Sequence, residues 1–212
     1  RAGSTGDTMN NQPHDHPHGR DDEDSVSYYR TMEIAVRALL IEKGVFTPED
    51  VRRTVEAMDA RDPSRGARVV ARAWKDEAYR ERLLANGTEA VEELGLAVGP
   101  LKLVVVENTP ATHNVIVCTL CSCYPRMLLG LPPDWYKSRE YRSRVVREPR
   151  AVLADFGTRL PEGISVRVHD STADMRYMVL PMRPVDADGV PEPILARRVT
   201  RDARIGTAVI DR

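Results

Sequence analysis

All three cysteines of this chain lie within six consecutive residues, as Cys118, Cys121 and Cys123. An odd and tightly clustered set of cysteines does not supply the widely spaced disulfide framework that holds small secreted proteins together. The fold must therefore rest on an ordinary hydrophobic core. The cysteines themselves form a Cys-x-x-Cys-x-Cys loop, which is typical of a metal site.

Zinc is the first alternative to consider for such a loop. Zinc sites are tetrahedral and generally take their remaining ligands from a second Cys/His pair with its own short spacing. The sequence contains no such pair, since His113 stands alone five residues before Cys118 and His169 is remote. A Cys3His zinc site therefore has little support, and polar Thr119 and Ser122 argue against a loop of merely buried cysteines.

The Cys-x-Cys end of the loop permits a different kind of coordination. Two thiolates separated by one residue hold a single ion while the backbone between them folds close to it, so that the amides of Ser122 and Cys123 point at the metal. Once deprotonated, these amides add two nitrogens to three sulfurs, which fills five positions of an octahedron. That ligand set favours low-spin trivalent cobalt or iron over Zn²⁺, and the open sixth position is where chemistry takes place.

The loop and its surroundings resemble the alpha subunit of cobalt-type nitrile hydratase over roughly residues 27 to 208. The resemblance rests on four stretches of the sequence, namely Val117–Pro125, Leu129–Lys137, Tyr141–Arg150, and Asp170-Ser171 with Met175–Tyr177. In that family a threonine at the position of Thr119 and a tyrosine at that of Tyr124 accompany cobalt. The resemblance implies one non-corrin Co³⁺ ion per chain, with Fe³⁺ as the less favoured alternative.

The resemblance also implies a role for each residue of the loop. Cys118, Cys121 and Cys123 bind the ion through sulfur, and the backbone nitrogens of Ser122 and Cys123 complete the ligand set. Cys121 is oxidised to a sulfinic acid and Cys123 to a sulfenic acid, two steps of the cysteine oxidation ladder. Ser122 and Cys123 are the expected catalytic positions, and the nucleophile is either the Cys123 sulfenate oxygen or a water that it activates.

Three further residues are expected near the loop. Asp170 and Arg176 match positions that orient the metal-binding loop in the family, although a surface ion pair is the simpler interpretation of the two. Arg126 replaces the tryptophan that many cobalt enzymes carry after the Tyr-Pro pair, so it lies on the approach of the substrate or pairs with a partner chain. The Tyr-Pro-Arg sequence is also similar to the gamma subunit of thiocyanate hydrolase. No glutamine stands near the site, in contrast to iron members of the family.

The implied activity is hydration of a nitrile to its amide by an alpha subunit that works only with partner subunits. The expected partner is a beta subunit, whose arginines contact the oxidised sulfurs. Split beta-like subunits, as in the enzyme that acts on the nucleoside toyocamycin, are the alternative. A cobalt-inserting activator is a further expected partner. Thiocyanate hydrolysis is the alternative, placed second because Leu84–Ala90 and Val106–Thr109 look more like the nitrile enzymes. An alternative of another class is a non-catalytic redox module that uses Cys118 and Cys121 as a dithiol.

Composition excludes several other classes of function. The net charge is only −1 and aromatic residues make up 5% of the chain, so nothing favours binding to nucleic acid. No apolar run is long enough to cross a bilayer and no charged-then-apolar signal opens the chain. A soluble, cytoplasmic subunit is the expectation.

The pattern of the chain predicts an α+β fold, in which a helical N-terminal arm precedes a layered α/β domain that carries the cysteine loop. Residues 1–26 are polar and predict a disordered tail, whose alternating histidines at 14, 16 and 18 are a solvated segment or a weak metal site. Residues 27–98 predict a helical region, and residues 99–212 predict the metal-binding catalytic domain. The apolar stripe of the first helix favours an arm that grips the beta subunit.

Individual elements follow from turn and capping signals. Thr47 followed by Pro48 predicts a helix start, and Asn86-Gly87 predicts a break between helices. The expected strands are Leu103–Val106, Val115–Val117, Ile164–Val168 and Tyr177–Leu180. The remaining expected helices cover Pro132 to Val146, Pro149 to Gly157 and Pro191 to Val199, with a tail after the last of them.

Overall fold

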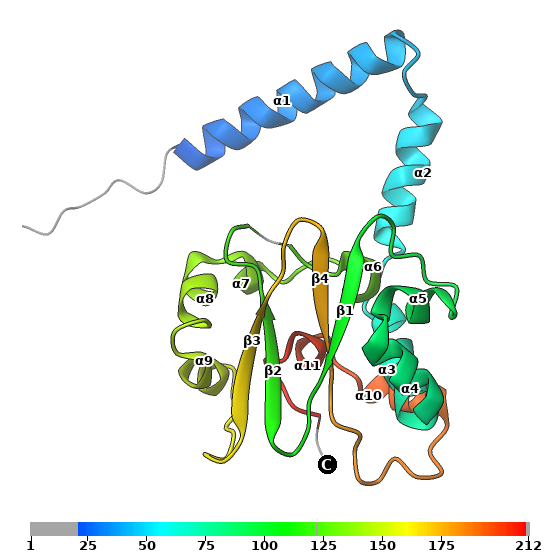
Figure 1. The fold of residues 1–212 in the computed structure, drawn as a ribbon. Coiled ribbons are helices and arrows are strands. Elements are labelled where there is room, and N and C mark those ends of the chain that lie inside the picture. The colour runs from blue at the N-terminus through cyan, green and yellow to red at the C-terminus, as the bar shows by residue number, and fades with distance from the viewer. Residues whose placement is uncertain (1–20, 122, 211–212) are drawn as a thin grey trace, which may run out of the picture. The chain divides into compact units, whose positions relative to one another are not determined.

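The computed structural model describes residues 21–121 and 123–210, and for residues 21–27 it describes the backbone alone. The described chain forms two compact units, one ending at Val55 and the other beginning at Glu56. The fold is of the predicted α+β class, since helices combine with two small pairs of parallel strands (Figure 1). The histidine-rich part of the expected tail lies outside the described residues, and the domain boundary expected after residue 98 stays a prediction.

The first unit is helical. Helix α1 covers Asp21–Glu42, and α2 covers Pro48–Asp59. Helix α1 begins before residue 27 because residues 21–24 are acidic, which suits the positive end of a helix dipole. Thr47 caps α2 as predicted: its hydroxyl accepts from the Asp50 amide, and the Asp50 carboxylate accepts from the Thr47 amide. No residue of α2 is buried, and no helix in the described part of the chain is long and apolar enough to cross a membrane.

Three helices open the second unit: α3 (Ser64–Lys75), α4 (Glu77–Ala85) and α5 (Gly87–Glu92). Asp76 caps α4 and Asn86 caps α5, each through its side-chain oxygen, so the predicted break at Asn86-Gly87 is confirmed. Helix α3 buries an apolar stripe that includes Trp74. The Trp74 indole N–H donates to the Pro181 carbonyl at 2.9 Å, which joins the helices to the end of the last strand.

The strands of the second unit are β1 (Lys102–Glu107), β2 (Thr112–Val117), β3 (Ser165–Asp170) and β4 (Met175–Leu180). All four expected strands are therefore confirmed. β1 pairs in parallel with β4, and β2 pairs in parallel with β3. In the second pair, Val117 lies opposite Asp170, so both strands end at the point where the cysteine loop begins.

Short helices fill the long connections: α6 (Arg126–Leu129), α7 (Asp134–Lys137), α8 (Arg139–Arg144), α9 (Pro149–Asp155), α10 (Glu192–Arg198) and α11 (Arg201–Ile205). The single helical region expected from Pro132 to Val146 is divided, because Ser138 is extended and caps α8. Helices α6 and α11 were not expected; they are too short to show a period and depend on tertiary packing. In Figure 1, α8 and α9 lie beside β3, whereas α3, α4 and α5 lie beside β1.

Helix α11 is fixed against β2 at Gly206. Gly206 has a left-handed backbone with φ +94°, and a Cβ at this position would run into the carbonyl oxygen of Asn114 on β2. The Gly206 carbonyl in turn accepts a hydrogen bond from Nε2 of His113 at 2.7 Å. The strand that carries the cysteine loop is thus supported by the C-terminal helix.

We expect Gly206→Ala to lower the free energy of unfolding by about 2–5 kcal/mol, because it adds backbone strain to a steric clash. Gly189→Ala is the matched control: Gly189 also has a positive φ, +74°, but no atom lies within 4 Å of the place that a Cβ would occupy, so strain alone costs about 1–2 kcal/mol. Urea unfolding of the full chain measures both. Equal losses would contradict the close approach of α11 to β2.

Candidate metal centre

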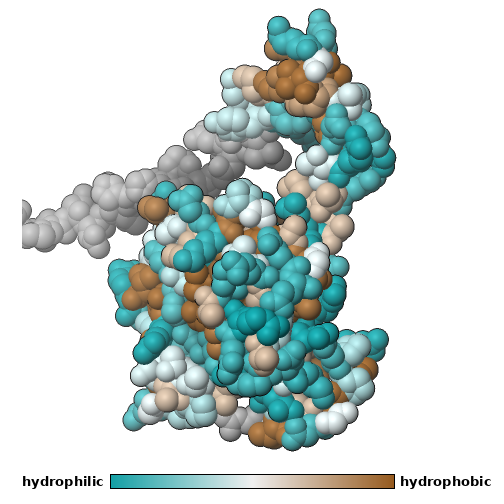
Figure 2. Space-filling view, turned by 45° about the vertical axis from the view of Figure 1, so that its right-hand side comes forward, coloured by the Kyte–Doolittle hydropathy of each residue, from teal (hydrophilic) through white to brown (hydrophobic). Residues whose placement is uncertain are grey.

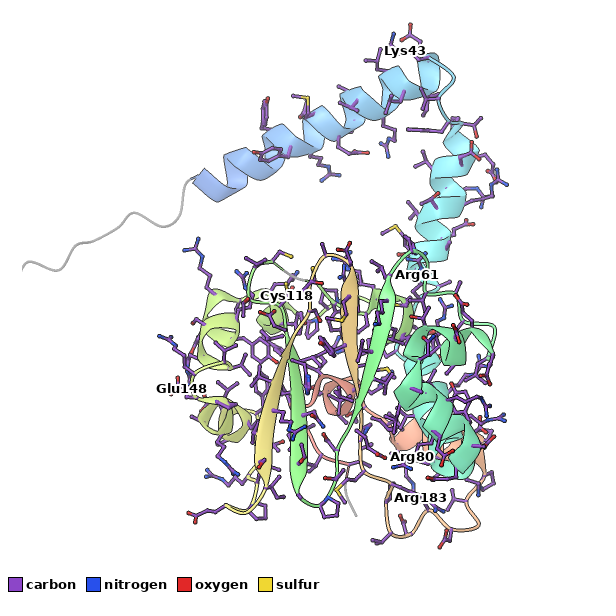
Figure 3. All side chains as sticks on the ribbon, in the orientation of Figure 1. Lys43, Arg61, Arg80, Cys118, Glu148 and Arg183 are labelled. Atoms are coloured by element: carbon purple, nitrogen blue, oxygen red, sulfur yellow. The ribbon has the colours of Figure 1, made fainter. Side chains whose placement is uncertain are left out.

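The cysteine loop leaves the end of β2, where Figure 3 labels Cys118. Cys118 is buried, Cys123 is half-buried and Cys121 is exposed. The sulfurs of Cys118 and Cys121 lie 3.5 Å apart, those of Cys121 and Cys123 lie 3.2 Å apart, and all three lie within 4.8 Å of one another. The structure therefore brings the three expected sulfur ligands together. Ser122, expected to contribute a backbone nitrogen, lies outside the described residues.

Asp170 holds the first turn of the loop. Its carboxylate accepts from the Thr119 backbone amide at 2.9 Å and from the Thr119 hydroxyl at 2.5 Å. Inside the same turn, the amide of Cys121 donates to the Cys118 sulfur at 3.3 Å. Asp170 reaches Thr119 because β3 runs parallel to β2 and ends beside it. Asp170 therefore bonds directly to the loop, and its expected role in orienting a metal site stays a prediction.

Arg176 does not pair with Asp170. Its guanidinium donates to the backbone carbonyls of Thr172 and Ala173, and the described ion pairs contain neither Asp170 nor Arg176. The surface ion pair considered from the sequence is therefore absent from the described residues. Arg176 instead lies beside the loop, where its positive charge acts on Cys123.

A cavity of about 590 Å³ opens beside the loop and is lined by Cys121 and Cys123. Three arginines share its wall, Arg61, Arg126 and Arg176, and no aspartate or glutamate among the described residues does. Residues 97–101 and Met127 add apolar atoms to the same lining. Arg126 lines the same cavity as two of the sulfurs, and its expected role, on the approach of a substrate or in pairing with a partner chain, stays a prediction. The cavity combines soft metal ligands, positive charge and an apolar wall.

Arg61 was not foreseen from the sequence. It lies in the connection before α3, at the same end of the unit as the cysteine loop (Figure 3). More than fifty residues separate it from Cys118, and no motif surrounds it. Its backbone carbonyl packs against Gly130, where a Cβ would come within 2.9 Å of it. Only the tertiary fold brings this arginine to the cavity.

The electrostatics of Cys123 bear on metal loading. Burial raises the pKa of the Cys123 thiol to about 12, the neighbouring thiols of Cys121 and Cys118 add to the rise, and the charge of Arg176 opposes it. Metals bind the thiolate, so an ion that enters the site must displace this proton.

Neither histidine considered as a zinc ligand lies at the sulfurs. Nδ1 of His113 accepts from the Asn108 side chain and its Nε2 donates to the Gly206 carbonyl. His169 donates from Nε2 to Oδ1 of Asn114 at 2.8 Å. Burial lowers the pKa of both rings, so both act as neutral, packed imidazoles. Among the described residues, the three cysteines are the one group of His, Cys, Asp or Glu side chains close enough together to hold a metal ion.

A family model described as "Nitrile hydratase, alpha chain" matches residues 27–208. This chain belongs to the nitrile hydratase alpha family. It is 48% identical to the cobalt-containing nitrile hydratase subunit alpha of Pseudonocardia thermophila over 81% of this chain and 86% of that protein. It is also 43% identical to the thiocyanate hydrolase subunit gamma of Thiobacillus thioparus, over 88% of this chain and 82% of the relative.

A solved structure of the same family supports the fold. A double mutant of the Fe-type nitrile hydratase from Comamonas testosteroni Ni1 matches with a TM-score of 0.80 and 42% identity, covering 87% of this chain and 91% of that one. The family therefore includes enzymes for two substrates and centres of two metals. Membership alone chooses neither the substrate nor the metal of this chain.

We expect Asp170→Ala to expose the Thr119 amide, because the substitution removes both oxygens that hold this turn. Hydrogen bonds to a charged acceptor are among the stronger ones in proteins, so amide exchange at Thr119 should accelerate roughly tenfold or more. Hydrogen–deuterium exchange of the full chain measures this. Asp174→Ala is the control, since the hydrogen bond at Asp174 uses its backbone carbonyl. Unchanged exchange at Thr119 in Asp170→Ala would show that the Asp170 carboxylate does not hold this turn.

Proposed function

We propose that this chain is the metal-binding, catalytic subunit of a nitrile hydratase, a lyase that adds water to a nitrile to give the amide. The observation that supports the proposal is a group of three thiols within 4.8 Å of one another, two of which, Cys121 and Cys123, line a cavity of about 590 Å³. A small apolar nitrile suits the apolar wall of this cavity. Its polar end suits the sulfurs and arginines that share the lining.

The donor set fits the metal of the family. Cys118, Cys121 and Cys123 offer soft sulfur ligands in one turn, and the backbone nitrogens of Ser122 and Cys123 would complete the set. Thr119 and Tyr124 are the residues that accompany cobalt in the family, so we propose non-corrin Co³⁺ in preference to Fe³⁺. A trivalent ion held there supplies Lewis acidity toward the nitrile nitrogen or toward water.

The residues of the chain itself have separate tasks in this proposal. Cys118 anchors the site in the core, because its side chain is 1% exposed. Cys121 and Cys123 face the cavity, where we propose oxidation to a sulfinic and a sulfenic acid. Oxidised sulfurs carry negative oxygens, and the positive charge of Arg176 beside Cys123 favours them. Either the Cys123 oxygen or a water that it activates would attack the nitrile carbon, while Asp170 keeps the loop oriented.

We further propose that the site is completed by a beta-type partner. Leu120 in the loop is 89% exposed, so a partner that covers the loop would bury it. A second surface lies on α1, where exposed large side chains include Tyr28, Tyr29, Met32 and Leu39, and brown, hydrophobic residues show on the helices of the first unit in Figure 2. A cobalt-inserting activator is a further partner of the proposal.

Metal content and intact mass test this function together. The chain is co-expressed with its partner subunits in cobalt-supplemented cells, and cobalt, iron and zinc are measured per chain. We expect about one cobalt per chain and a mass gain of three oxygens, two for a sulfinic and one for a sulfenic acid. Zinc, or unoxidised thiols without metal in the assembled complex, would reject the hydratase and support the thiol redox module.

Thiocyanate hydrolysis is the second candidate, and the arginines favour it. Arg126 shares the cavity wall with Arg61 and Arg176, and three positive charges without a carboxylate among the described lining residues attract a small anion. The relative from Thiobacillus thioparus is a thiocyanate hydrolase subunit. The charge of the cavity therefore offers a direct way to separate the two substrates.

Arg126→Gln should lower kcat/KM for thiocyanate about tenfold and leave that for acetonitrile within about twofold, because a lost charge weakens only the attraction of the anion. Arg126→Lys is the matched control, since it keeps the charge, and should retain most of the thiocyanate activity. Steady-state rates of the assembled, metal-loaded complex give both values. An equal fall for the two substrates would show that Arg126 acts on the site as a whole and does not select anions.

A further inference from the structure

Two tyrosine hydroxyls tie the ends of the cysteine loop to a buried aromatic cluster. The Tyr136 hydroxyl donates to the carbonyl of Cys123 at 2.9 Å, and the Tyr141 hydroxyl donates to the carbonyl of Ile116 at 2.7 Å. The first carbonyl closes the loop and the second belongs to the strand just before Cys118. Both tyrosines are buried, with exposed fractions of 0% and 4%.

Packing within the aromatic cluster holds these two hydroxyls in position. The ring of Tyr136 packs edge-on against Tyr124 with centroids 4.9 Å apart, and Trp135 packs against Tyr141 at 4.9 Å and against Phe156 at 4.6 Å. Rings in such arrangements attract one another beyond the burial of their area. Because close-packed rings have little freedom to turn, the donor at the end of Tyr136 stays where the Cys123 carbonyl needs it.

The two ends of the loop differ in how much other support they have. At the first end, Cys118 follows directly on β2, whose residues pair with β3, and Thr119 is clamped by Asp170. At the second end, Cys123 belongs to no helix or strand. Among the described residues, the side chain that hydrogen-bonds to the Cys123 backbone is Tyr136. The position of Cys123 therefore depends on this tyrosine more than Cys118 depends on Tyr141.

We propose that Tyr136 is a positioning residue for the metal centre, whose hydroxyl orders Cys123 before the ion binds. This inference rests on the proposed function, because it assumes that Cys123 is a ligand. A loop that is ordered in advance loses less conformational freedom when the ion binds, and affinity rises accordingly. Tyr136 touches neither metal nor substrate in this role; it acts through the Cys123 backbone alone.

Tyr136→Phe tests the inference by metal loading and not by turnover. The full chain is co-expressed with its partner subunits over a series of cobalt concentrations, and cobalt and iron per chain are measured. Tyr136→Phe should need about threefold to tenfold more cobalt for half loading, the effect of one lost hydrogen bond. Tyr79→Phe is the control, because the Tyr79 hydroxyl is buried without a hydrogen-bond partner among the described residues and its removal should leave loading unchanged.

Tyr141→Phe separates positioning from stability. It removes a hydroxyl from the same aromatic cluster and leaves a backbone carbonyl unpaired, so it should lower the Tm of the metal-free complex about as much as Tyr136→Phe does. Positioning predicts a larger loss of loading for Tyr136→Phe. Equal loss of loading in the two variants, or wild-type loading in Tyr136→Phe, would overturn the inference. If the wild-type complex binds neither cobalt nor iron, the proposed function itself fails.

Discussion

The register between β2 and β3 is the constraint on which the metal-binding loop depends. Val117 lies opposite Asp170, so the carboxylate stands at the level of the first residues after β2 and accepts both hydrogen bonds of Thr119. Successive side chains of a strand point to opposite faces, so a slip by one residue would turn Asp170 away from the loop. The run from His113 to Val117 is buried throughout, and a slip would break the hydrogen bonds that His113 makes to Gly206 and Asn114 makes to Asn108.

The sequence predicted those parts of the fold that local signals determine. The cap at Thr47, the break at Asn86-Gly87, the β-branched runs of the first two strands and the alternation of the third are local patterns, and each was found where it was expected. The parallel pairing of the strands and the short helix α11 were not predicted, because long-range contacts determine them. Arg204 of α11 illustrates the reason: its side chain is 1% exposed and its Nη1 donates to the carbonyl of Pro63. No sequence pattern identifies an arginine as part of a core.

In the candidate site, too, some features follow from the local sequence and others depend on the tertiary fold. The three cysteines lie close together in the sequence, so their gathering in space follows from a single turn. Arg61 reaches the cavity from a distant connection, and the Tyr136 hydroxyl reaches Cys123 through an aromatic cluster drawn from several short helices. Asp170 and Arg176 were expected near the loop through the family resemblance, but their contacts were not. Asp170 bonds to Thr119, whereas Arg176 bonds to backbone carbonyls of the β3–β4 connection, and both sets of contacts depend on the positions of β3 and β4.

The contacts around the loop indicate how a metal site is built from one short segment. Asp170 holds the turn after Cys118, and Tyr136 holds the residue at the other end, so both ends are fixed by groups that are not ligands. The centre of the loop is open to solvent, with Cys121 exposed and Leu120 almost fully so. Fixed ends lower the entropy that an ion must overcome, whereas an uncovered centre leaves room for an ion to enter and for a partner to close over it.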